Sequence, residues 1–174
     1  MAPAVTPSGE PIDGELELIG PAPGQKPPAP MSTQRKARKQ ALDVLFEAEL
    51  TSVRIRDRLE KPQSDEETAL RPLAQQILQA YNAHPGEIDE AIGAHLAQGW
   101  SLTRMPRVDR CLARIAVAEM WFVDTPVAVA ITEAVALAEV YSTDESPAFL
   151  NGVLGRIAAG ERPGSQSADA EPPA

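Results

Sequence analysis

Apolar residues return every three or four positions along most of the chain, which is the spacing of one face of an α-helix. The clearest stretch runs from Pro126 to Tyr141, and its apolar positions are Val127, Ala130, Ile131, Ala134, Val135 and Ala138. Pro126 suits the first position of a helix, and Thr125 before it can act as the N-cap. We predict a helix here and place it at the centre of the fold.

A second helix is predicted directly after this one, beyond a short acidic loop. Ser146 and Pro147 repeat the start signal of a capping residue followed by proline. The apolar positions that follow are Phe149, Leu150, Val153, Leu154 and Ile157. The pattern therefore predicts two helices that flank a loop ending at Ser146.

The first predicted helix runs from residue 32 or 33 to about residue 50 and has two distinct faces. The apolar face, which we assign to the core, consists of Ala37, Ala41, Val44, Leu45 and Ala48. At 100° per residue, Arg35, Lys39, Leu42 and Phe46 fall on a different stripe, almost opposite Ala37. This second stripe brings an aromatic ring into line with two cations.

Similar periodicity predicts further helices between these ends. One begins at Pro72 and stops before Pro85, one spans residues 88–96 with His95 at the core edge, and one covers residues 108–121. The polar stretch 51–71 is predicted to be part helix and part connection, with a capping box at residues 64–67. Trp100 and Trp121 are expected in the core or at its edge. No segment alternates with period two, so we predict an all-α bundle of about seven helices.

Three arginines in the helix at residues 108–121 and just before it also share a face. Arg107, Arg110 and Arg114 follow one another at steps of three and four residues. Two interpretations remain open. The arginines pair with acids such as Asp109, Glu119 or others elsewhere, or they present a second basic surface.

Composition divides the chain into one domain and two tails. Residues 1–31 include eight prolines and little aromatic or β-branched material, so a disordered tail is expected. Residues 32–158 form the predicted helical domain, and residues 159–174, rich in Gly, Pro, Ser and Ala, a second disordered tail. A second hypothesis is that translation begins at Met31.

The charge of the chain is distributed unevenly. The net charge is −9, yet residues 32–39 carry four cations and no acid, namely Arg35, Lys36, Arg38 and Lys39. Cations at a helix N-terminus oppose the helix dipole, so contact with a polyanion explains them better than a solvated first turn does. Cations that hold phosphates beside an aromatic ring suit single-stranded RNA.

Other chemistry is sparse. With one cysteine and two distant histidines, we expect no disulfide, no metal site and no cofactor. We assign no catalytic residues and expect a binding protein and not an enzyme. No apolar run is long enough for a membrane span or a signal peptide, so a cytoplasmic protein is expected.

Several motifs resemble the NusB family of transcription antitermination factors. They are Ala130-Ile-Thr-Glu-Ala134, Asp144-Glu-Ser-Pro-Ala-Phe-Leu-Asn-Gly-Val-Leu154, and Trp-Ser-Leu, Met-Pro-x-Val-Asp-Arg and Leu-x-Arg-Ile-Ala between residues 100 and 116. The resemblance covers roughly residues 33–157 and implies the same helical fold. It also implies binding to the boxA element of nascent ribosomal RNA together with the ribosomal small-subunit protein NusE, in a complex that helps RNA polymerase resist termination.

The resemblance further implies site residues. The RNA-binding set is Arg35, Lys36, Arg38, Lys39, Phe46, Glu145, Ser146 and Phe149. The partner-binding set is Asp109, Arg110 and Glu119. Family members often carry a basic residue where Ala148 stands and a tyrosine where Phe46 stands, so these contacts are expected to differ here. Phe149 is expected to share one surface with the Arg35 to Lys39 turn, although its ring can also close the core.

Three other interpretations stay open. A related helical domain precedes the catalytic domain of certain RNA cytosine methyltransferases, but the chain ends too soon after Ile157 to carry such a domain. A protein–protein adaptor would dock an acidic partner through residues 35–39 without binding RNA. A homodimer could bury the RNA-binding face as a storage form.

Overall fold

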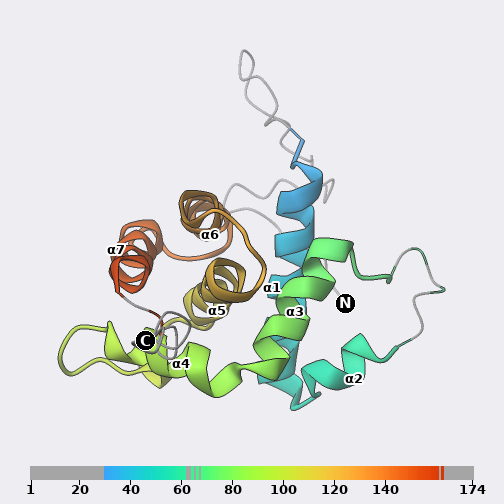
Figure 1. Cartoon of the computed structure of the whole chain (residues 1–174), viewed down its shortest axis with the longest axis horizontal. Coiled ribbons are helices and arrows are strands. Elements are labelled where there is room, and N and C mark those ends of the chain that lie inside the picture. The colour runs from blue at the N-terminus through green and yellow to red at the C-terminus, as the bar shows by residue number, and fades with distance from the viewer. Residues whose placement is uncertain (1–29, 62–63, 65, 67, 161, 163–174) are drawn as a thin grey trace, which may run out of the picture. The chain divides into compact units, whose positions relative to one another are not determined.

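The computed structural model describes residues 30–61, 64, 66, 68–160 and 162. In these residues the chain forms seven α-helices and one 3₁₀ turn, and no strand (Figure 1). The elements are α1 (Thr33–Thr51), α2 (Ile55–Leu59), α3 (Pro72–Ala83), α4 (Pro85–Ala94), η1 (Leu102–Arg104), α5 (Arg107–Phe122), α6 (Val127–Tyr141) and α7 (Ser146–Ala159). The predicted all-α class and helix number are confirmed. None of the described helices is long and apolar enough to cross a membrane.

Three sequence predictions fall wholly or mostly outside the described residues. They are the N-terminal tail over residues 1–31 with its alternative start at Met31, the C-terminal tail over residues 159–174, and the capping box at residues 64–67. All three stay predictions.

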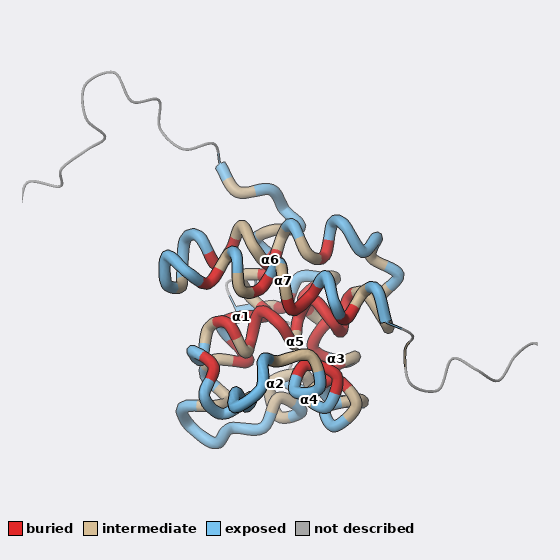
Figure 2. Tube along the Cα trace, turned by 90° about the vertical axis from the view of Figure 1, so that its left-hand side faces the viewer, coloured by how far each residue is buried: buried red, intermediate tan, exposed pale blue. Residues whose placement is uncertain are grey.

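The centre of the bundle is α5, which packs against α1, α3, α4, α6 and α7. Buried residues gather along and around this helix (Figure 2). The residues of α5 that are at most 1% exposed are Cys111, Leu112, Ala113, Ile115, Ala116, Val117, Ala118 and Glu119. Helix α5 is thus covered on several sides, although its sequence also carries charged residues.

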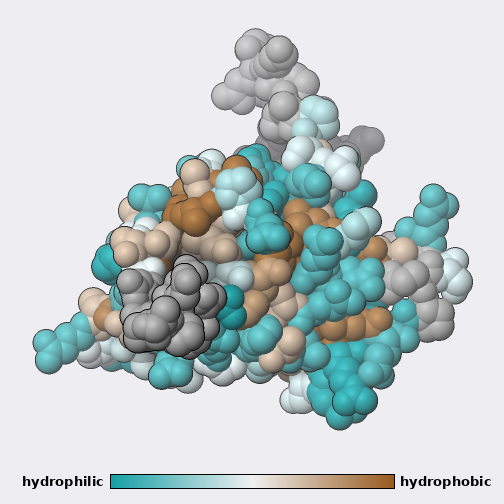
Figure 3. Space-filling view, in the orientation of Figure 1, coloured by the Kyte–Doolittle hydropathy of each residue, from teal (hydrophilic) through white to brown (hydrophobic). Residues whose placement is uncertain are grey.

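This arrangement corrects the expectation that α6 is the central helix. Only Ala130, Ala134, Leu137 and Ala138 of α6 are buried. The side away from α5 and α7 faces solvent, with Val129 42% and Val140 65% exposed. Figure 3, which has the orientation of Figure 1, shows apolar surface over α6. Because small apolar residues occur on most sides of α6, its sequence does not distinguish the buried stripe from the exposed one.

The helix starts follow the predicted chemistry with two exceptions. Ser32 caps α1, since its side chain accepts a hydrogen bond from the Arg35 backbone N–H at 3.2 Å. The capping role given to Thr125 is wrong, because Pro126 occupies the cap position of α6. The Thr125 hydroxyl instead donates to Glu119 Oε1 at 3.0 Å. Ser146 is likewise the first residue of α7 and not its cap, which is Glu145.

A buried ion pair joins α1 to the far end of α5. Arg38 is 5% exposed and Glu119 is fully buried. The Arg38 guanidinium donates to both Glu119 oxygens, with Nη2 to Oε1 at 2.7 Å and Nε to Oε2 at 2.9 Å. Such a pair holds the two helices in one register, since either charge alone would be costly to bury.

We expect Glu119→Ala to destabilise the protein strongly. Removal of the carboxylate leaves the Arg38 guanidinium buried with only Glu133 nearby, at 3.8 Å, and an uncompensated buried charge costs about 3 to 5 kcal/mol. Thermal unfolding followed by circular dichroism measures the effect. The control is Glu60→Ala, which removes a pair with Arg56 whose side chains are 62% and 64% exposed. Equal melting temperatures for the two variants would contradict the assignment.

Candidate nucleic-acid interface

The four cations at the start of α1 do not share one environment. Lys36 is exposed, and no hydrogen bond or ion pair reaches its side chain from the described residues. Lys39 pairs with Asp43 at 2.5 Å and lies over the Tyr141 ring, 4.8 Å from its centroid. Arg38 is buried against Glu119. This placement corrects the expectation that Arg38 offers its charge to RNA.

Arg35 is half-exposed and held by a carboxylate of α6. Its Nε and Nη2 atoms each donate to a Glu133 oxygen at 2.8 Å. This hydrogen bond raises the pKa of Arg35 and lowers the pKa of Glu133. Any phosphate that approaches Arg35 therefore competes with Glu133.

Two aromatic rings flank a pocket at the start of α7. The rings of Trp100 and Phe149 have centroids 6.4 Å apart and are tilted by 41°. The pocket has a volume of about 150 Å³, and its lining residues are Trp100, Pro106, Asp109, Thr143, Glu145, Ser146 and Phe149. Phe149 packs partly against the core, so its ring both touches the core and faces the pocket. Trp100 is 50% exposed, and its expected core position is wrong.

Cations accompany these rings and Phe46. The Arg104 guanidinium lies 5.6 Å from the Trp100 ring centroid, and Arg104 is exposed. The Arg107 guanidinium lies 5.8 Å from the centroid of Phe46, which packs against the core. Because Pro106 of the pocket precedes Arg107 directly, Phe46 and the pocket lie on neighbouring parts of the surface.

Tyr141 stands between the basic turn and the pocket. It lies beneath Lys39 at the end of α6, 38% exposed, and residues 142–145 lead from it to the pocket. Lys39 and Phe149 therefore connect through this short segment and not through direct contact. Glu145 is exposed at the pocket, whereas Ser146 is 1% exposed and donates its hydroxyl proton to Asp109 of α5.

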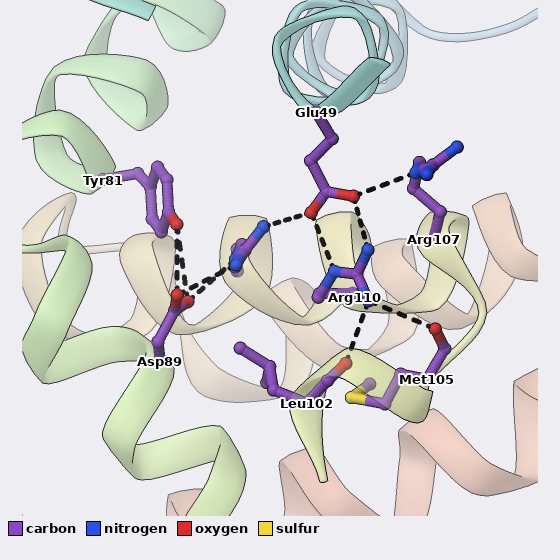
Figure 4. A network of polar contacts seen from close by, with 8 residues as sticks. Glu49, Tyr81, Asp89, Leu102, Met105, Arg107 and Arg110 are labelled. Atoms are coloured by element: carbon purple, nitrogen blue, oxygen red, sulfur yellow. Dashed lines mark hydrogen bonds and ion pairs between the residues drawn. The ribbon is translucent and has the colours of Figure 1, made fainter. Parts of the chain in front are cut away.

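The three side chains expected to meet a protein partner lie inside the fold. Asp109 is 2% exposed and Glu119 is fully buried. Arg110 donates to Glu49 and to the backbone oxygens of Leu102 and Met105 (Figure 4). All three carry buried or half-buried polar groups that bind neighbouring elements. This corrects the expectation that they form an exposed contact surface.

The arginines of α5 form a network with two acids (Figure 4). Glu49 at the end of α1 pairs with Arg107 at 3.2 Å, with Arg110 at 2.6 Å and with Arg114. Arg114 also pairs with Asp89 of α4 at 2.8 Å. The interpretation that these arginines pair with acids elsewhere is confirmed, and the partners are Glu49 and Asp89, not Asp109 or Glu119.

Sequence reasoning did not assign Trp100, Arg104 or Tyr141 to this surface, and it named Arg107 only as a candidate for a second basic surface. Trp100 lies between α4 and α5, where no helical period indicates burial. The lack of helical periodicity around Trp100 is the one feature of the sequence that indicates an exposed ring. Tyr141 gives no comparable signal, since its position beneath Lys39 arises only from the tertiary fold, in which side-chain contacts such as Arg35 with Glu133 link α1 to α6.

The Glu49 network predicts a loss of stability in acid. Burial raises the pKa of Glu49, but the hydrogen bond and charge of Arg110, together with Arg114, outweigh it and hold the pKa below the ordinary 4.5. The folded state thus binds fewer protons than the unfolded state below pH 4.5. Stability should be fully present above that pH and should decline as the pH falls through the lowered pKa.

Glu49→Gln should lower stability at neutral pH and flatten this acid decline. Urea unfolding at a series of pH values gives the free energy of unfolding for each protein. Glu60→Gln, at an exposed position, is the matched control and should keep the original slope. A decline of unchanged steepness in Glu49→Gln would show that other carboxylates, such as Glu133, dominate.

Comparison with known proteins identifies the family of this chain. The transcription antitermination protein NusB of Salinispora arenicola strain CNS-205 is 50% identical over 136 residues, which cover 74% of this chain and 96% of that protein. The NusB protein of Arthrobacter sp. strain FB24 is 45% identical over 128 residues, covering 73% and 93%.

Solved structures agree with the sequence relatives. T. maritima NusB superposes with a TM-score of 0.64 at 28% identity, covering 77% of this chain and 96% of that chain. A structure of antitermination factors NusB and NusE in complex with dsRNA gives a TM-score of 0.58 at 27% identity, covering 74% and 98%. The model of the NusB family matches residues 35–159. On this match and these relatives, the chain belongs to the NusB family.

Proposed function

We propose that this protein is an RNA-binding transcription antitermination factor. It binds boxA-type single-stranded RNA of ribosomal RNA transcripts together with the ribosomal protein NusE, and the complex helps RNA polymerase resist termination. Relatives that carry the name transcription antitermination protein support this proposal, as does the solved complex of NusB, NusE and RNA. The protein acts in the cytoplasm by binding and not by catalysis, through the helical domain at residues 32–158.

The observation that carries the proposal is the alternation of cations and aromatic rings on one surface. Lys39 lies over Tyr141, Arg104 over Trp100 and Arg107 over Phe46. Cations hold phosphates, and exposed rings stack on bases that have left a helix. A duplex keeps its bases stacked inside, so the rings favour a single strand or a splayed segment.

Each residue of the RNA-binding set has a distinct role in this proposal. Arg35, Lys36 and Lys39 contact phosphates, while Phe46 and Phe149 contact bases or sugars. Glu145 is exposed at the pocket, and its carboxylate can accept a hydrogen bond from the exocyclic amino group of a base. The buried Arg38 and Ser146 hold this surface from within.

The decisive experiment is a binding assay with a boxA-type RNA oligonucleotide and a scrambled oligonucleotide of equal length. Each is measured with and without NusE. We expect the boxA-type RNA to bind more tightly, and NusE to strengthen that binding. If the protein binds NusE but shows no affinity for RNA, either by itself or together with NusE, the adaptor interpretation is favoured.

Phe149→Ala and Lys39→Ala should weaken RNA binding in different ways. Loss of a stacked base costs about 1 to 3 kcal/mol and leaves the salt dependence nearly unchanged. Loss of a phosphate contact flattens the slope of log affinity against log salt by about 0.7 on a single strand. Fluorescence anisotropy at several salt concentrations separates the two.

Phe149 also touches the core, so the melting temperature of the Phe149→Ala variant serves as the control. A lower melting temperature with normal RNA affinity at a temperature where the variant is folded would assign Phe149 to the core alone. An unchanged salt slope in Lys39→Ala would remove Lys39 from the phosphate contacts.

Glu133→Gln should strengthen RNA binding. The change removes the negative charge that holds Arg35 and frees a cation for phosphate, so the salt slope should steepen by about 0.7. The control is Glu47→Gln, an exposed carboxylate on the same helix as Arg35. Weaker binding by Glu133→Gln, with the control unchanged, would instead mean that Glu133 orients Arg35 for its contact.

A further inference from the structure

The carboxylate of Asp109 lies at the Trp100 and Phe149 pocket and binds two serine hydroxyls. Asp109 stands in the first turn of α5 and is 2% exposed. Ser142 Oγ donates to its Oδ1 at 2.5 Å, and Ser146 Oγ donates to its Oδ2 at 2.8 Å. One buried side chain therefore ties α5 to both ends of the loop between α6 and α7.

The hydroxyl protons of this cluster have one consistent arrangement. Ser142 and Ser146 each donate their only proton to Asp109, so their oxygens can otherwise only accept. Ser146 Oγ accepts from the Thr143 backbone N–H at 3.2 Å and from the Thr143 hydroxyl at 2.8 Å. A carboxylate, which only accepts, completes this arrangement. An amide has only one acceptor oxygen, so it could accept from one of the two serines and would present its NH2 group to the hydroxyl oxygen of the other.

This cluster joins the two walls of the pocket. Trp100 and Pro106 precede α5 on one side, and Glu145 and Phe149 lie on the loop and α7 on the other. We propose that Asp109 is a positioning residue for RNA. It fixes the separation of the two walls and thereby how a base stacks against Trp100 or Phe149, an inference that rests on the proposed function.

Burial distinguishes this role from a contact role. Both Asp109 oxygens are engaged by serines, and little of the side chain reaches the surface. A residue that acts through the loop should change base stacking and leave phosphate contacts intact. Phosphate contacts dominate the salt dependence of RNA binding, so the two effects separate experimentally.

The test uses Asp109→Asn and the milder Ser142→Ala in a Trp121→Phe background, where Trp100 is the remaining tryptophan. Ser101→Ala is the matched control, because the Ser101 hydroxyl sits beside Trp100 but bonds to Thr103 and not to Asp109. Affinity for a boxA-type RNA oligonucleotide is measured at several salt concentrations, with the change in Trp100 fluorescence on binding and the melting temperature of each protein.

We expect Asp109→Asn to bind roughly tenfold more weakly, the scale of a lost base stack, with an unchanged salt slope and a smaller Trp100 response. Ser142→Ala should shift both readouts in the same direction by less, and Ser101→Ala should shift neither. If folded Asp109→Asn and Ser142→Ala lose only melting temperature, or only NusE association, the positioning role is overturned. Absence of RNA binding by the unaltered protein, with and without NusE, would overturn the proposed function itself.

Discussion

Burial of α5 on several sides is the constraint on which the rest of the structure depends, because this helix carries ionic side chains into the bundle. Taking a charge out of water is costly unless an opposite charge or several hydrogen bonds meet it. The buried and half-buried ionic residues of α5 are Asp109, Arg110, Arg114 and Glu119. Different parts of the chain meet them, namely the α6–α7 loop, the turn before α5, both halves of α1, and α4. Apolar packing brings these elements against α5, and the charge pairs fix the position of each element along the helix.

The same anchors shape the proposed RNA surface from within. Arg110 holds the backbone of the η1 turn that follows Trp100, while Asp109 holds the loop that precedes Phe149. Glu49 binds Arg107, whose guanidinium lies over Phe46. Of these α5 groups, Asp109 and Arg110 are buried or half-buried, whereas Arg107 at the start of the helix is exposed. The exposed rings and cations belong to flanking loops and helix ends whose positions α5 determines.

This division explains how far the sequence predicts the structure. Periodicity predicts the bounds of α1 and α7 closely, although Leu42, which lies on the second stripe of α1, is buried as well. It fails to rank α5 above α6, since α6 has the more apolar sequence, while the buried residues of α5 include paired charges. The partners of those charges lie far away, as with Arg38 and Glu119, which are 81 residues apart. Family resemblance names Asp109 as a candidate contact residue, but only the packing shows that this carboxylate faces inward.

Paired charges also explain how a protein with net charge −9 can offer a surface to RNA. Glu133 holds Arg35 and Asp43 holds Lys39. A phosphate that binds either cation therefore gains only the difference between its own attraction and that of the carboxylate it displaces. Generic polyanions, which offer only charge, therefore gain little. A strand with bases free to stack gains from Trp100 and Phe149 as well, and that contribution does not depend on displacing a carboxylate. Within the proposed function, partial neutralisation of the basic turn thus shifts discrimination from charge toward the bases.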